Sequence, residues 1–242
     1  MRHPLVLALL AVMAGIGLWQ SASRPAANAA PIGLFTSLPI LWSEQAELAR
    51  IVDDDTPPHW ARAEIERLGP PLALDTLLDL RKVDRLILAQ PRALAPDENV
   101  ALDHWVRQGG RVLVMADPML TQDSAFPLGD KRRPQEIAML SPILGRWGLT
   151  LRFDEGQQAG EHLAEREIAG APLPVNLPGR FAPGGRGHEA ACTITPSGLL
   201  ARCRIGKGQA LLLADAALLE PDDAQGRRSR AFAALLAAAF AQ

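Results

Sequence analysis

Two apolar runs separated by one amphipathic helix limit the folds open to this chain more than any other feature of its sequence. The runs are Val83–Gln90 and Arg111–Asp117. The first is apolar on both faces, as a central parallel strand should be. Between the runs, Pro96 opens a helical pattern, and Gly109 and Gly110 close it. A strand, a crossover helix and a second strand form a right-handed βαβ unit, so the sequence predicts an α/β fold with a parallel sheet.

Further strands are predicted on either side of this unit, where short apolar runs are bounded by turn residues. They are expected at Ile32–Phe35, 71–77, Leu149–Phe153 and Ala210–Ala214. The stretch between Gly156 and Gly187 is rich in Gly and Pro, and we expect loops there with one or two edge strands around Ile168–Leu177.

Helices are predicted where apolar residues recur at helical spacing. One is expected over Ser43–Val52, and a second begins with Thr56 as N-cap and Pro57 and ends at Gly69. A third covers Gln135–Trp147. The last is an amphipathic helix at the end of the chain. Its sheet-facing residues are expected to be Phe232, Leu235, Leu236, Ala239 and Phe240.

The length and composition are those of one folded domain behind a short leader. The chain has 242 residues, of which 48% are hydrophobic, and this is enough to bury a sizeable core. We assign residues 1–30 to the leader and its linker, and residues 31–242 to the α/β domain. The net charge is −2, and Lys and Arg form no long basic run, so no nucleic acid is expected as a partner.

The first residues have the pattern of an export signal. Arg2 and His3 precede the uncharged apolar run Leu5–Trp19, which is shorter than the roughly 20 residues that a membrane-spanning helix needs. Small residues between 21 and 29 offer cleavage sites. Without cleavage, Gln20–Ala30 becomes a tether that holds the domain at the outer face of the inner membrane. The sequence therefore predicts a periplasmic domain, either released or anchored.

The two cysteines flank a predicted hairpin. Cys192 and Cys203 lie on β-prone runs around a turn that contains Pro196 and Gly198. A four-residue turn would place the two cysteines opposite each other, and in an oxidising compartment they could form a disulfide. A three-residue turn would offset them and point their side chains to opposite faces of the hairpin.

Two longer stretches carry a family resemblance. The stretches "VDRLILAQPRALAPDENVALDHWVRQGGRVLVMADPML" and "RIGKGQALLLADAALL" are similar to the gliding-motility-type auxiliary components of ABC transport systems. The soluble domains of that family share the fold of class I glutamine amidotransferases. The resemblance implies a three-layer sandwich with a mainly parallel central sheet, flavodoxin-like, plus a late β-hairpin. It also implies an exported or membrane-anchored domain beside permease and ATPase subunits or other envelope proteins, generally without a demonstrated active site.

The candidate site residues follow the predicted strands. Asp117 and Asp215 each end an apolar strand, and Thr36 and Ser37 follow the first one. The carboxyl ends of parallel strands are where ligands collect, so these four residues are the ligand-binding candidates. Working amidotransferases carry a Cys on a sharp turn after a central strand, and the corresponding turn here is Ala116-Asp117-Pro118, without that nucleophile.

Three functions follow from these residues. The first is a non-catalytic exported accessory domain, in which the carboxylate of Asp117 accepts backbone N–H bonds in a turn shaped by Pro118. The second is a periplasmic hydrolase that uses Asp117 and Asp215 as acid and base or with a metal. The third is a binding module for a cell-envelope ligand. No catalytic residue, cofactor or metal is assigned.

Overall fold

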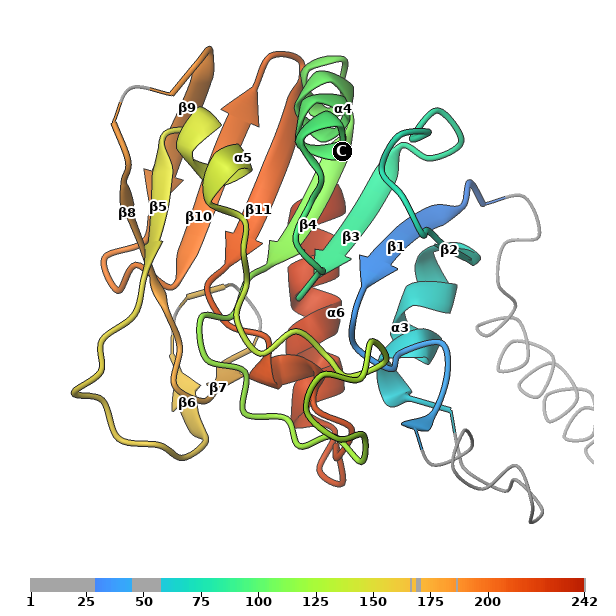
Figure 1. Cartoon of the computed structure of the whole chain (residues 1–242), viewed down its shortest axis with the longest axis vertical. Coiled ribbons are helices and arrows are strands. Elements are labelled where there is room, and N and C mark those ends of the chain that lie inside the picture. Colours follow the sequence, from blue (N-terminus) through green and yellow to red (C-terminus); the bar gives the residue numbers. More distant parts are fainter. Residues whose placement is uncertain (1–28, 45–57, 166, 169–170, 186, 242) are drawn as a thin grey trace, which may run out of the picture.

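A seven-stranded sheet runs through the protein (Figure 1), and the fold is mixed α/β with a mostly parallel central sheet. The computed structural model describes residues 29–44, 58–165, 167–168, 171–185 and 187–241. The strand order is β2-β1-β3-β4-β11-β10-β9. The strands of the sheet are β1 (Ile32–Thr36), β2 (Pro71–Ala73), β3 (Arg85–Ala89), β4 (Arg111–Met115), β9 (Ala190–Ile194), β10 (Leu200–Ile205) and β11 (Gly208–Leu213).

The strands from β2 to β11 pair in parallel, and β10 and β9 add an antiparallel extension. The predicted strand–helix–strand unit is present as β3, α4 (Pro96–Arg107) and β4, and its two strands are neighbours in the sheet. The residues Leu86–Ala89 and Val112–Met115 are buried, because helices cover both faces of the sheet at these positions.

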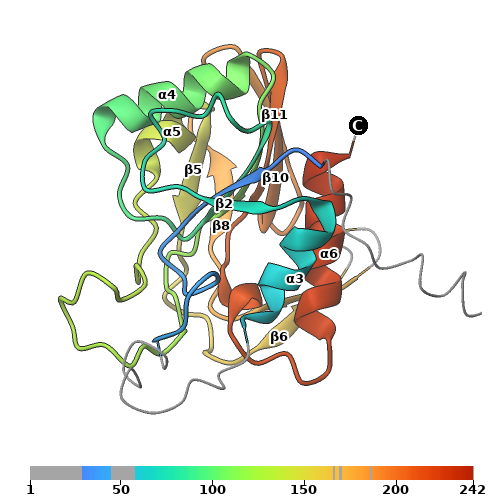
Figure 2. The ribbon, with the colours of Figure 1, turned by 90° about the vertical axis from the view of Figure 1, so that its right-hand side faces the viewer.

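The helices lie on the two faces of the sheet (Figure 2). Helix α4 and the short α5 (Ser141–Arg146) cover one face, and α3 (Trp60–Leu68) and α6 (Arg227–Phe240) cover the other. A single turn of 3-10 helix, η2 (Ala217–Leu219), follows β11. None of the helices in the described part of the chain is long and apolar enough to cross a membrane.

Helix α4 is fixed at both ends by specific contacts. At its start, the Glu98 carboxylate accepts the backbone N–H of Ala95 at 3.0 Å, and the guanidinium of Arg92 lowers the pKa of Glu98 to about 2. Near its end, the Trp105 indole donates to the Val83 carbonyl at 3.0 Å. These contacts hold the crossover helix against the strand that precedes it.

The hairpin between β9 and β10 has a four-residue turn. Thr195 donates its backbone N–H to the Leu200 carbonyl at 2.9 Å, so residues 196–199 form the loop. Cys192 and Cys203 therefore lie in register, and the structure joins them by a disulfide with a Cα–Cα distance of 4.0 Å. The disulfide ties the outermost strand of the sheet to its neighbour.

Two small sheets lie beside the main one. Strand β5 (Leu149–Arg152) pairs with β8 (Arg180–Pro183), and β6 (His162–Ala164) pairs with β7 (Leu173–Val175). The strand expected at Leu149–Phe153 is therefore present but outside the central sheet. Of the edge strands expected around Ile168–Leu177, the structure shows β7.

Three helix predictions need correction or fall outside the described residues. The helix expected over Gln135–Trp147 forms only as α5, because residues 135–140 use their backbone groups elsewhere, as shown below. Helix α3 begins at Trp60 with His59 as its N-cap and ends before Gly69. Thr56 and Pro57 lie outside the described residues, and so does most of the helix expected over Ser43–Val52.

The last helix buries the face that its spacing predicts. All five expected residues are buried. Phe232 also meets the ring of Trp60 on α3 edge to face, with 5.9 Å between ring centroids. Helix α6 therefore links the sheet to α3 through one aromatic contact.

We expect Phe232→Ala to lower the free energy of unfolding by about 3–5 kcal/mol, because it removes a fully buried ring from the core. Urea unfolding followed by circular dichroism measures the change. Leu128→Ala is the control, since Leu128 is 80% exposed and should cost less than about 0.5 kcal/mol. Equal costs for the two variants would contradict the packing of α6.

Candidate functional site

The candidate site is the edge formed by the carboxyl ends of the parallel strands. The order of the strands reverses at β1, since β2 lies on one side of it and β3 on the other. Ligands of open parallel sheets bind in the crevice at such a reversal. Thr36 ends β1 and Ser37 follows it at this crevice, and Asp117 follows β4 two strands away.

Asp117 is completely buried, and backbone groups occupy both of its carboxylate oxygens. Oδ1 accepts the N–H of Met119 at 2.8 Å, and Oδ2 accepts the N–H of Ala216 at 3.0 Å. The first bond closes a turn at Pro118, as expected for an Asx turn. The second joins the end of β4 to the segment that follows β11.

Asp215 is buried in the same way at the end of β11. Its Oδ1 accepts the N–H of Ala217 at 2.7 Å, which begins η2, and its Oδ2 accepts the N–H of Asn176 at 3.0 Å. The aspartate thus connects the central sheet to the loop that follows β7. The two carboxylates predicted to share one edge do lie close enough to influence each other's charge.

Burial disfavours the charged form of both aspartates. It raises the pKa of Asp117 to about 6, against the opposing effect of the two N–H donors. It also raises the pKa of Asp215 well above its usual value, and the neighbouring charge of Asp117 adds to this shift. Two carboxylates with raised pKa values are a feature of many catalytic sites, although buried structural pairs show it too.

Thr36 and Ser37 turn inward and bind the protein itself. Thr36 Oγ1 accepts the N–H of Leu38 at 3.0 Å. Ser37 Oγ donates to the Gln90 carbonyl at 2.5 Å and accepts the N–H of Gln135 at 2.9 Å. The crevice between β1 and β3 is therefore bridged by hydrogen bonds within the chain.

Gln90 is a central residue of this edge that the sequence interpretation missed. Its side chain is fully buried, and its Oε1 accepts the N–H of Asp117 at 2.9 Å. Its Nε2 donates to the carbonyl of Asp117 at 3.1 Å and to that of Gln135 at 2.8 Å. Gln90 also has a φ of 40°, a strained backbone that its hydrogen bonds maintain. A polar residue at the end of the apolar strand, before Pro91, was the available signal.

Residues 118–140 cover the edge without forming a helix or strand. Leu120 donates its N–H to the Glu136 carbonyl at 2.9 Å, and Ala138 donates to the Asp117 carbonyl at 2.8 Å. Together with the bond from Gln90 to the Gln135 carbonyl, these bonds take backbone groups that the expected helix would have used. In Figure 1 this segment loops across the lower end of the sheet.

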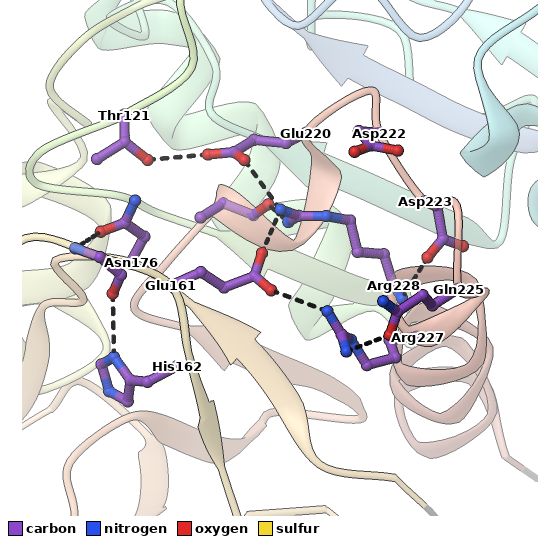
Figure 3. Close-up of polar contacts among 12 residues, drawn as sticks. Thr121, Glu161, His162, Asn176, Glu220, Asp222, Asp223, Gln225, Arg227 and Arg228 are labelled. Atoms are coloured by element: carbon purple, nitrogen blue, oxygen red, sulfur yellow. Dashed lines mark hydrogen bonds and ion pairs between the residues drawn. The ribbon is translucent and has the colours of Figure 1, made fainter.

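The buried side chain of Arg228 on α6 connects several segments at this edge of the sheet (Figure 3). The Arg228 side chain donates to Glu161, to Glu220 and to the carbonyl of Ala217. Glu220 in turn accepts the hydroxyl of Thr121 at 2.9 Å. Helix α6, the segment after β11 and the covering segment 118–140 are thereby connected through one charged cluster.

One cavity of about 780 Å³ opens beside this edge, between α3 and the N-terminal end of α6. Its walls include Trp42, Glu44, His59, Trp60 and Gln122. His59 and Glu44 are already engaged, with the Leu219 carbonyl at 3.0 Å and the Ala125 N–H at 2.7 Å. Within the described ranges, no three His, Cys, Asp or Glu residues gather as a metal site would require.

Comparisons with known proteins give weak matches only. No protein-family model and no curated protein matches the chain. Among solved structures, an exo-β-1,4-mannosidase from Opitutaceae bacterium strain TAV5 has a TM-score of 0.49, with 17% identity over 91% of this chain and 38% of its own. A β-galactosidase from Rahnella sp. R3 has a TM-score of 0.47, with 14% identity over 86% of this chain and 31% of its own. The chain thus spans well under half of either enzyme.

A smaller structural match has similar length to this chain. Cytoplasmic protein STM3548 from Salmonella typhimurium has a TM-score of 0.38 and 12% identity, over 85% of this chain and 95% of its own. At this level of likeness none of the three proteins carries an activity over to this chain.

Asp117→Asn should change how stability depends on pH. The folded-state pKa of Asp117 lies above the unfolded value of 3.8, so its contribution to stability is fully present below pH 3.8 and is lost as the pH rises through about 6. Between about pH 4 and pH 7, the wild type should lose roughly 1–3 kcal/mol more unfolding free energy than the variant. Denaturant unfolding across this range measures the difference.

The comparison with the variant is needed because His59 titrates with the opposite sign. Burial lowers the pKa of His59, so its contribution to stability is lost as the pH falls. His59 is present in both proteins and cancels in the difference. Parallel stability curves for the wild type and Asp117→Asn would show that Asp117 is not a buried group with a raised pKa.

Proposed function

We propose that this chain is an exported, non-catalytic accessory domain with an amidotransferase-like fold, which acts beside the permease and ATPase subunits of an ABC-type transport system. The strand order β2-β1-β3-β4-β11 corresponds to the flavodoxin-like order 2-1-3-4-5, and a late hairpin follows it. This order supports the fold that the sequence resemblance implies. The N-terminal apolar run supports export, with the domain in the periplasm and either released or tethered.

The state of Asp117 is the observation on which the non-catalytic assignment rests. Asp117 follows a central strand, at the position where working amidotransferases carry their nucleophile. Here the residue has no exposed surface, and its oxygens are held by the N–H groups of Met119 and Ala216. A carboxylate that binds two fixed donors in the interior has no free face for a substrate, so we assign it to structure.

Exposed apolar side chains on the covering segment support a protein partner. Met119, Leu128, Ile137 and Met139 all belong to residues 118–140 and are exposed. Nearby, Trp42 is also exposed, and its ring lies 6.1 Å from that of Phe126. Methionine and aromatic side chains in such a setting are typical of surfaces that bind other proteins. We assign this surface to contact with a transport subunit.

The hydrolase remains the second candidate because of the raised pKa values of Asp117 and Asp215. A general acid at neutral pH needs such a shift, but it also needs access to the substrate. Purified protein that contains a stoichiometric metal, or that loses a hydrolytic activity in Asp117→Asn without losing stability, would favour this function over the accessory one.

We expect Ile137→Glu/Met139→Glu to abolish crosslinking to the permease subunit of the proposed transport system. The two side chains are 56% and 52% exposed, so charges there should leave folding intact while they disrupt an apolar interface. Leu78→Glu/Val100→Glu is the matched control, since these side chains are 55% and 69% exposed and lie outside the covering segment. Crosslinking of the wild type that identifies no transport subunit would contradict the accessory function.

Export predicts an oxidised pair of cysteines in the mature protein. We expect native protein to contain no reactive thiol at Cys192 or Cys203, and Cys192→Ser/Cys203→Ser to lower the unfolding free energy by about 3 kcal/mol, because the short loop is no longer closed. Thiol-specific alkylation and mass spectrometry of protein from its native host check the first point. Reduced cysteines in that protein would contradict residence in the periplasm.

A further inference from the structure

A basic groove lies at the opposite edge of the sheet from the two aspartates. It has a volume of about 510 Å³ and is bounded by the C-terminal end of α6 and by the strands β9, β10 and β11. Four cationic side chains line it: Arg111, Arg202, Arg204 and Lys207. No Asp or Glu occurs among the described residues of its walls.

The alternation of β10 creates this groove. Ala201, Cys203 and Ile205 point into the core, while Arg202 and Arg204 are exposed on the other face. Their neighbours in register on β9 are Thr193 and Ala191, which are small and uncharged. Helix α6 packs on β4 and β11, so it borders the outer face of β10 without covering it.

The four positive charges have no carboxylate partner within the described residues. Arg111 donates to the carbonyls of Phe240 and Ala241, at 3.1 and 3.0 Å, and Arg202 donates to the carbonyl of Ala238 at 3.3 Å. The structure gives the side chains of Arg204 and Lys207 no hydrogen bond or ion pair with any described residue. Cations that converge in a groove without counter-charges attract anions.

The groove lies at the edge where the chain enters the domain. Ile32, Arg85, Arg111 and Gln209 are in register across β1, β3, β4 and β11. With neighbouring strands about 4.8 Å apart, three such steps place β11, on the side of the groove nearer β1, about 15 Å from the first strand. Arg85 also donates to the carbonyl of Ala30 at 3.0 Å, which fixes the end of the linker at this edge.

We infer that this groove docks the domain on the anionic phospholipid headgroups of the membrane that holds the N-terminal segment. The inference rests on the anchored form of the proposed function. The linker Gln20–Ala30 can reach at most about 35–40 Å when extended, so an anchored domain stays close to the bilayer. The unpaired cations match the phosphate groups of an anionic surface, where each Lys or Arg strengthens binding about fivefold.

The test uses the full chain reconstituted into vesicles of phosphatidylcholine, with or without phosphatidylglycerol. The sequence contains three lysines, at positions 82, 131 and 207, so a membrane-impermeant amine reagent followed by mass spectrometry reports each site separately. Labelling of Lys207 should fall about fivefold or more when phosphatidylglycerol is present. Labelling of Lys131, in the covering segment at the other edge, should not change, and high salt should restore labelling of Lys207.

Charge-reversal variants identify the groove as the cause. Arg202→Glu/Arg204→Glu should remove the protection of Lys207 by phosphatidylglycerol. Arg152→Glu/Arg230→Glu is the matched control, because it makes the same change in charge at two exposed arginines outside the groove. Unchanged urea unfolding of both variants confirms that each one folds.

Three results would overturn the docking. Lys207 could be labelled equally with and without phosphatidylglycerol, or its protection could survive Arg202→Glu/Arg204→Glu. Soluble glycerol phosphate could also protect Lys207 as well as the vesicles do, which would make the groove a site for small anions. Flotation of the vesicles in a density gradient tests the anchoring by itself. Protein that does not float with the vesicles refutes the anchoring. Protein that floats but leaves Lys207 unprotected refutes only the docking.

Discussion

The hydrogen bonds of buried polar groups at the carboxyl edge are the constraint on which the rest of this structure depends. Gln90, Asp117 and Asp215 are all fully buried, and each would destabilise the fold if its polar atoms were left without partners. Each aspartate has one local and one distant backbone donor: Met119 and Ala216 for Asp117, and Ala217 and Asn176 for Asp215. The aspartates therefore position the turn after β4, the start of η2 and the loop after β7.

The same bonds explain why this edge closes. In an open parallel sheet, the crevice beside β1 is available to a ligand. Here Ser37 and Gln90 bind the backbone of Gln135 across that crevice, so the covering segment takes the place that a ligand would occupy. The exposed apolar side chains of the covering segment lie on the outer surface of this edge, and this is the surface that we propose contacts a protein partner.

Local patterns were sufficient for the elements that bury one clear apolar face. The unit β3-α4-β4, helix α6 and the hairpin with Cys192 and Cys203 follow from spacing and turn residues alone. The inward turn of the Asp117 carboxylate also followed from Pro118. The helix expected over Gln135–Trp147 failed before α5 because Asp117 accepts the N–H of Ala138, while Gln90 and Leu120 donate to the carbonyls of Gln135 and Glu136. Gln90 and the groove around Arg204 depend on the order of the strands, which a single sequence does not show.

The two edges of the sheet would also give the domain a direction in the anchored form that we propose. The basic groove and the carbonyl of Ala30 lie at the edge where the parallel strands begin, and the covering segment lies where they end. A five-residue strand such as β3 separates these edges by roughly 17 Å. If the groove contacts the headgroups, the exposed apolar side chains at Ile137 and Met139 face away from the bilayer. A transport subunit that binds them must therefore extend above the membrane surface, so we expect a periplasmic region of the partner, rather than a membrane-embedded helix, to make this contact.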